Sequence, residues 1–156
     1  IHMRESNGWG RNKRDVKVYV TYVNLDKLSA SSASNMFSDG PIKFTTLDVH
    51  ASSAANIEVS IDGGDVTVHA SSAGDISLEG KAKSLRADAS SAGEIDAYNL
   101  TVEGAEASAS SAGTVKLNVS TSLEAHASSG GSIRYRGNPG KTNTDSSSGG
   151  SVKRSN

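Results

Sequence analysis

The chain has 156 residues, of which 16 are glycine and only 4% are aromatic, so a core of large aromatic side chains is excluded. It contains no cysteine, which excludes disulfides, thiol catalysis and cysteine-ligated zinc. The net charge is −1, the bases collect toward the two ends, and no run of 18 apolar residues occurs. We therefore predict no nucleic-acid partner and no transmembrane segment.

The N-terminal segment is predicted to precede the folded domain. Residues 1–3 (Ile-His-Met) resemble a cloning remnant, and residues 4–14 are polar and basic. We expect residues 1–14 to be such a remnant followed by a flexible N-terminal segment. Apolar residues then alternate over residues 16–22, which predicts a first strand there and a β-helix domain over residues 15–156.

From residue 30 onward the chain repeats a cluster of very small residues. The clusters begin at residues 30, 51, 70, 89, 109, 127 and 146, and apolar pairs with a spacing of two, such as Val66/Val68 and Ile76/Leu78, flank them. A period of two indicates strands, and a unit of this length is shorter than a strand–helix–strand crossover unit. The sequence therefore predicts an all-β fold, a single-stranded parallel β-helix (β-solenoid) with about seven coils of 18–21 residues.

The small clusters are predicted to form tight corners between successive strands. Their leading alanines continue the inward-facing series, and glycine can supply a positive φ at the bend. Seven equivalent serine pairs indicate a structural position, because a nucleophilic serine needs one positioned base, so no catalytic residue is predicted. We expect the hydroxyls to bond to neighbouring backbone or to each other. The predicted structural corner residues are Ser71, Ser72, Gly74, Ser90, Ser91, Gly93, Ser110, Ser111 and Gly113.

One outward position carries candidate metal ligands. The residue before the leading alanine is His50, His69 and Asp88 in three consecutive coils. In a parallel solenoid these side chains would stack about 5 Å apart, and imidazole and carboxylate groups bind zinc or copper. The sequence favours the alternative, a solvated polar ladder in which histidine and aspartate pair. No cofactor is predicted.

The repeat and its two end segments resemble the head GIN domain family of bacterial adhesins, which is common in Bacteroidetes. The segments are DVKVYVTYVNLDKLSASSAS at 15–34 and IRYRGNPGKTNTDSSSGGSVKR at 133–154, together with the Ser-Ala-Gly cluster at 91–93. The resemblance implies an exported, non-catalytic protein of the periplasm, outer membrane or cell surface whose partner is an extracellular protein or glycan. Because members of the family usually carry a further N-terminal β-region, this chain resembles the C-terminal part of such a domain.

A second hypothesis is that the chain is a structural, self-assembling protein. An uncovered N-terminal coil would offer an open parallel edge to another copy, giving a homo-oligomer or an end-to-end filament. At the other end, Thr142, Thr144 and Ser146 take the place of apolar inward residues, which predicts a polar cap.

Overall fold

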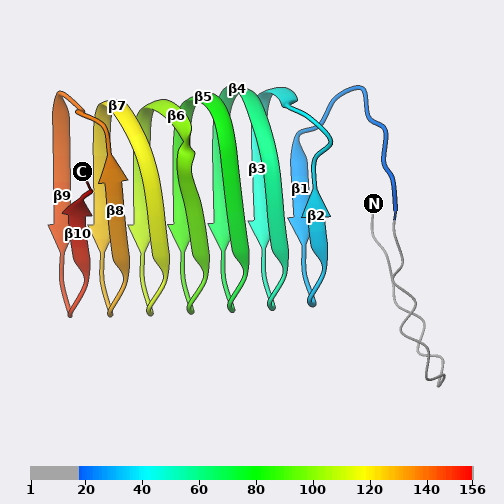
Figure 1. Ribbon diagram of the computed structural model, residues 1–156. Helices are drawn as coiled ribbons and strands as arrows, with labels where there is room; N and C mark the ends of the chain where they lie inside the picture. The colour runs from blue at the N-terminus through cyan, green and yellow to red at the C-terminus, as the bar shows by residue number, and fades with distance from the viewer. Residues whose placement is uncertain (1–17, 156) are drawn as a thin grey trace, which may run out of the picture.

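The computed structural model describes residues 18–155, and this part of the chain is all-β, with no helix (Figure 1). It accordingly has no helix of the length and apolarity needed to cross a bilayer. The strands pair in parallel throughout and stack coil upon coil, so the predicted β-solenoid of about seven turns is confirmed. The strands are β1 (Lys27–Ala30), β2 (Asn35–Phe37), β3 (Ile42–Ala51), β4 (Asn56–Ala70), β5 (Asp75–Ala89), β6 (Glu94–Ala109), β7 (Thr114–Ala127), β8 (Ser132–Arg136), β9 (Lys141–Ser146) and β10 (Ser151–Arg154).

Each coil has an ascending half and a descending half, which face each other across a thin core (Figure 1). In β4, β5, β6 and β7 an upper bend joins the two halves within one long strand, whereas a loop joins β2 to β3 and β8 to β9, and a lower corner leads to the next coil. In β5, buried residues alternate over the ascending half at Ile76 and Leu78 and over the descending half at Leu85, Ala87 and Ala89, and the upper bend lies between them. The stacked ascending halves form what we call the ascending sheet, and the stacked descending halves form the descending sheet.

Alternation along each half-coil builds an aliphatic core with no buried polar or charged residue among those described. On the descending sheet, the leading alanines pair coil to coil and are at most 4% exposed, which confirms the predicted alanine ladder: Ala30, Ala51, Ala70, Ala89, Ala109 and Ala127. On the ascending sheet, a ladder of larger side chains is fully buried: Ile57, Ile76, Ile95, Val115 and Ile133. Burying one such aliphatic side chain contributes about 1.5–3 kcal/mol, and the ladder repeats that gain in each coil.

The prediction of a first strand over residues 16–22 is wrong for the part that the structure describes. Residues 18–26 form no strand, and the first regular element is β1 at Lys27–Ala30. The alternating side chains Val18, Val20 and Tyr22 are each more than 40% exposed, so their alternation does not mark a buried face. Residues 16 and 17 of this prediction, and the predicted remnant and flexible segment at residues 1–14, lie outside the described residues.

The last descending half-coil is polar, as predicted for a cap. Strand β9 pairs with β7 so that Thr142, Thr144 and Ser146 continue the inward series of the preceding coil, and β9 is exposed along its whole length. A polar final coil lets the apolar core end at water without leaving a large apolar surface.

Candidate functional site

The serine clusters form the lower corners, and each corner is a tight four-residue turn. In the corner at residues 71–74, the Gly74 N–H donates to the Ser71 carbonyl at 2.8 Å, and Ser72 and Ala73 have φ values of 50° and 60°. Two consecutive positive φ values with this hydrogen bond define a type I′ turn. Because each non-glycine residue in the left-handed region costs about 1–2 kcal/mol, these corners are strained and need support from their neighbours.

The expected reason for glycine holds in the last two corners, where Gly130 and Gly149 have φ values of 77° and 80°, but it is wrong for the predicted corner glycines. Positive φ falls on the serine and alanine that precede Gly74, Gly93 and Gly113, and not on these glycines. Glycine is needed here because a Cβ atom at these positions would lie 2.2–2.5 Å from an alanine carbonyl oxygen of the preceding coil. Each corner therefore lies flat against the one before it, at a distance that leaves room only for hydrogen.

Backbone hydrogen bonds, and not serine hydroxyls, hold one corner to the next. The Ser90 N–H donates to the Ala70 carbonyl at 2.9 Å, and the Ala73 N–H donates to the Ser91 carbonyl at 3.2 Å. Among the described corner serines, a side-chain hydrogen bond is found at Ser34, whose hydroxyl donates to the Ser31 carbonyl at 2.8 Å. The structure thus places the predicted corner residues in the turns and leaves most of their hydroxyls facing solvent.

The candidate metal ligands His50, His69 and Asp88 do stack in consecutive coils of the descending sheet. The two imidazole rings lie 6.1 Å apart between centroids, and His69 Nδ1 lies 3.9 Å from Asp88 Oδ2. The described part of the chain contains no group of three or more histidine, aspartate or glutamate side chains placed to hold a metal ion. The arrangement is that of a polar ladder in which His69 and Asp88 face each other as a half-exposed pair.

A shallow depression crosses the outer surface of the descending sheet near the upper bends, with a volume of about 640 Å³. It exists because Gly104 has no side chain and its register neighbours are Ser84 and Ser122. Arg86 and Glu106 line it and bond to each other at 3.2 Å. Arg86 and Glu106 in the depression therefore already have partners within the chain.

The outer surface of the ascending sheet carries a ladder whose charge changes sign along the solenoid. Its members lie in direct register from coil to coil: Glu58, Ser77, Asp96, Lys116, Arg134 and Lys153. Sequence reasoning noticed that bases gather near the C-terminus but missed this alignment. The available signal is spacing, because every member follows the leading alanine or serine of its own corner by seven residues.

Lys116 stands at the boundary between the acidic and basic parts of this ladder. Its Nζ donates to Glu94 Oε1 at 2.6 Å and lies 3.5 Å from Asp96 Oδ2. The hydrogen bond that Lys116 donates to Glu94 raises the pKa of Lys116 above its ordinary value. Beside this group, partial burial of the carboxyl and then the charge of Glu94 raise the pKa of Asp75.

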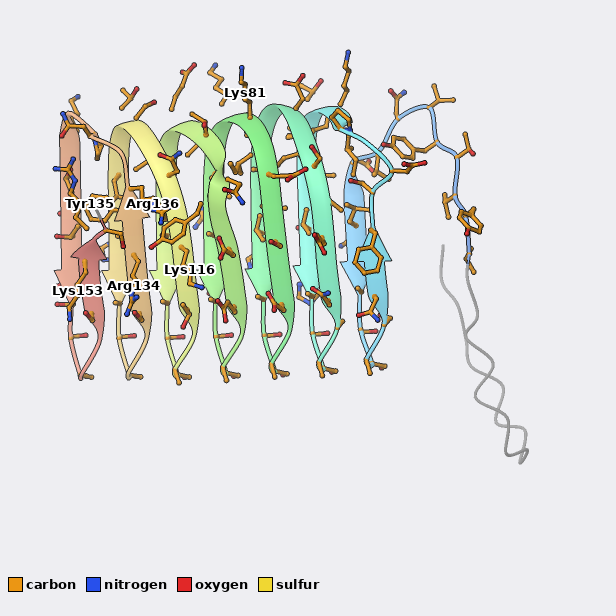
Figure 2. The ribbon with its side chains drawn as sticks, in the orientation of Figure 1. Lys81, Lys116, Arg134, Tyr135, Arg136 and Lys153 are labelled. Carbon is orange, nitrogen blue, oxygen red and sulfur yellow. The ribbon has the colours of Figure 1, made fainter. Side chains whose placement is uncertain are left out.

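Beyond Lys116 the ascending sheet is basic. Arg134, Arg136, Lys153 and Arg154 are exposed, and none of them takes part in a salt bridge with another described residue. The Arg136 guanidinium lies over the Tyr98 ring at 4.1 Å, and the Tyr98 hydroxyl lies 2.9 Å from Ser155 Oγ. Figure 2 shows Lys116, Arg134 and Lys153 on neighbouring coils of the same face.

The fold and its surface together define an all-β parallel solenoid that displays outward ladders of polar and charged side chains. Over residues 1–139 the chain matches the family model described as "Putative auto-transporter adhesin, head GIN domain", and it belongs to this family. The resemblance inferred from the repeat is thereby confirmed.

A solved structure gives an independent comparison of the fold. The chain is similar to the crystal structure of a putative adhesin from Bacteroides fragilis NCTC 9343, with a TM-score of 0.77 and 24% sequence identity. The match covers 84% of this chain and 61% of that one, so the present chain spans about three fifths of the relative's length. No curated protein matches the chain.

Proposed function

We propose that this chain is a non-catalytic adhesion module of an exported envelope protein, and that it binds an extracellular protein or glycan in the periplasm, at the outer membrane or at the cell surface. The observation that carries the proposal is the surface: each outward position presents its side chain again one coil away, so the molecule displays rows of groups along an extended face. Membership of an adhesin family supports the same role.

The rigidity of the solenoid supports a binding role. Backbone bonds join each coil to the next at the corners, and a continuous aliphatic core lies between the two sheets. A surface held in this way loses little conformational entropy when a ligand binds, which favours affinity for an extended partner. Solenoid proteins commonly use such extended faces for recognition.

A binding screen tests the adhesive function directly. Immobilised extracellular glycans and matrix proteins are exposed to the folded chain, and retention is measured by surface plasmon resonance at physiological salt. We expect at least one class of ligand to retain the folded chain, while a heat-unfolded sample of the same chain binds nothing above background. Failure to retain the folded chain across a broad panel would contradict the adhesive role.

One observation favours a second candidate function, self-assembly through the N-terminal end. Among the described residues, the most exposed large apolar side chains lie in the first coil or just before it, with Tyr19 at 89%, Val23 at 96% and Phe37 at 64%. Both β1 and β2 pair on one side with a described strand, and no described strand lies on their other side. Apolar groups beside strand edges are typical of surfaces that pair with another chain.

Light scattering against protein concentration separates the two functions. Assembly would give a steep rise in scattering that Val23→Ser and Phe37→Ser together abolish, with Tyr135→Ser at the opposite end as the matched control. A monomer at all concentrations would contradict self-assembly and leave the adhesion module as the better proposal.

A further inference from the structure

We propose that the basic end of the ascending sheet, formed by Lys116, Arg134, Lys153 and Arg136, is a binding site for an anionic polysaccharide that carries carboxylate or sulfate groups. The inference rests on the proposed adhesive function and names its ligand class. Three observations support it: the register of the strands, the lack of salt bridges at Arg134 and Lys153 among the described residues, and the position of Arg136 over the Tyr98 ring.

The register places three cations in a row. Lys116 pairs with Arg134 and Arg134 pairs with Lys153 in parallel strands, so the three side chains leave the sheet from adjacent coils. Adjacent strands are about 4.8 Å apart, and the row therefore spans about 10 Å along the solenoid. Like charges on neighbouring strands repel each other, and this repulsion destabilises the fold in the absence of a ligand. Binding of anions would reduce the repulsion.

The first and the later members of the row differ in their partners. The Lys116 ammonium already bonds to Glu94 at 2.6 Å, which balances its charge within the chain. Arg134 and Lys153 are exposed and form no salt bridge with any other described residue. Residues 128–155 contain five bases and one acid, so the field at this end is positive. An external anion can supply the missing partner for Arg134 and Lys153.

Arg136 adds a donor that is already held in place. Its guanidinium lies over the Tyr98 ring at 4.1 Å, and the Tyr98 hydroxyl is in turn 2.9 Å from Ser155 Oγ. Stacking on an aromatic face restricts the rotamers of an arginine and leaves N–H donors at the rim of the guanidinium plane. Such donors match the two oxygens of a carboxylate or sulfate.

The surroundings of the row favour a polysaccharide over other polyanions. Single-stranded nucleic acids bind where exposed aromatic rings stack on bases, but the Tyr98 ring is covered by Arg136, and Tyr135 is half-buried. Anionic membranes bind surfaces that combine bases with exposed apolar groups, and the large exposed apolar side chains of the described residues lie at the opposite end of the solenoid. A linear sugar chain with regularly spaced anions fits a straight row of cations on an open face.

The experiment measures binding of the whole chain to heparin, to polygalacturonate and to neutral dextran by calorimetry at low salt. We expect binding to heparin and polygalacturonate, weakening as salt rises, and none to dextran. Arg134→Glu with Lys153→Glu should lower the heparin affinity about tenfold or more, because two charge-assisted contacts become repulsive.

The matched control is Lys81→Glu with Lys83→Glu, which makes the same change in net charge at exposed positions of an upper bend, where Figure 2 shows Lys81. We expect the control to change the affinity less than twofold, an effect of net charge at long range. Equal losses in the two double variants, or no loss in either, would overturn the site. Circular dichroism and a thermal midpoint verify folding, and the neutral pair Arg134→Gln with Lys153→Gln should give an intermediate loss.

Two further outcomes would overturn the inference in distinguishable ways. Retention of a neutral glycan or a matrix protein equally by the wild type and by Arg134→Glu with Lys153→Glu would leave the adhesive function standing and reject this site. Salt-sensitive dimerisation without polysaccharide that the same variant abolishes would show a different partner. The basic row would then bind the acidic half of the ascending sheet on a second copy of the chain. Tighter binding to a single-stranded oligonucleotide than to heparin would assign it to nucleic acid.

Discussion

The lower corners and the upper bends both reverse the chain, yet they differ greatly in how much variation they accept. All seven corner clusters are built from alanine, serine and glycine alone, and the pairing of the six leading alanines runs coil to coil without a break. The register shifts lie away from the corners, toward and within the upper bends: between Ser77 and Glu79 in β5, and between Ala97 and Thr101 and between Val102 and Gly104 in β6. One end of each coil is therefore uniform and the other is adaptable.

The distance between backbones explains this difference. A Cβ atom at Gly113 in a corner would lie 2.2 Å from the Ala89 carbonyl oxygen, whereas at Gly104 in a bend the nearest atom would be the Ser122 hydroxyl at 3.2 Å. Backbone cannot move away without breaking the coil-to-coil hydrogen bonds, but a serine side chain can rotate. The bends are not uniformly loose, because Gly80 has a φ of 110° and approaches the Ile61 carbonyl closely.

The largest expected effect comes from inserting one residue. A glycine inserted after Ser91 breaks the turn that the Gly93 N–H closes and shifts the following half-coil, which should cost about 3 kcal/mol or more in unfolding free energy. A glycine inserted after Glu103 lies at an existing register shift, where it only lengthens the bend. It should therefore lower the unfolding free energy by about 1 kcal/mol or less. Urea unfolding followed by circular dichroism measures both, and similar losses would contradict the comparison.

The next effect concerns the missing Cβ atom itself. Gly93→Ala would place a methyl group 2.3 Å from the Ala70 carbonyl oxygen, and we expect a loss of about 2 kcal/mol from overpacking. Gly104→Ala is the matched change in a bend and should alter the unfolding free energy by about 0.5 kcal/mol or less. Ala55 occupies the corresponding position in the second corner, so a methyl group is accepted there. Equal losses at Gly93 and Gly104 would be evidence against backbone contact as the constraint.

A smaller effect of opposite sign is expected from relieving corner strain. Ala92 has a φ of 61°, and Ala92→Gly removes the Cβ atom that disfavours this conformation. The gain of about 1–2 kcal/mol is partly offset by the greater freedom of glycine in the unfolded chain, so the net stabilisation should be about 0.5 kcal/mol. Ala82→Gly in an upper bend, where φ is not positive, should be destabilising instead. Differential scanning calorimetry measures the change in thermal stability of both variants. A loss of stability in Ala92→Gly would contradict the claim that the corner is strained.

The smallest effect depends on pH and lies just beyond a lower corner. Because burial and Glu94 raise the pKa of Asp75 above 3.8, the folded chain keeps this proton to higher pH than the unfolded chain. Stability is therefore lost as pH rises through the window just above 3.8. Asp75→Asn should be slightly more stable than the wild type at pH 7, a difference that disappears below that window. Urea titrations on both sides of the window measure it.

Glu94→Gln provides the control for this last prediction. Removing the neighbouring charge should bring the pKa of Asp75 closer to its ordinary value, as read from the carboxyl carbon shift by NMR. If Asp75→Asn proved less stable than the wild type at pH 7, the carboxylate would be stabilising and the raised pKa would be contradicted.

The candidate sites show how far sequence reasoning reached. The polar ladder of His50, His69 and Asp88 could be anticipated because its members precede the corners at a constant offset. The basic row could have been found by counting forward from the same corners, but its chemistry depends on contacts that spacing does not reveal. Lys116 has acidic partners while Arg134 has none among the described residues, because Glu94 and Asp96 belong to the adjacent coil on one side only.

The sequence by itself determined the coiled all-β architecture, because a period of two and a repeat of small residues leave few other ways to bury so many aliphatic side chains. It also determined which alanines form the inner ladder. Only the tertiary structure decided why the corners need glycine, since the answer lies in the carbonyl of a residue one coil earlier in the chain. The contacts of Tyr98 with Arg136 and Ser155 were likewise set by the tertiary structure, because the register shift after Ala97 moves the Tyr98 side chain out of the regular repeat.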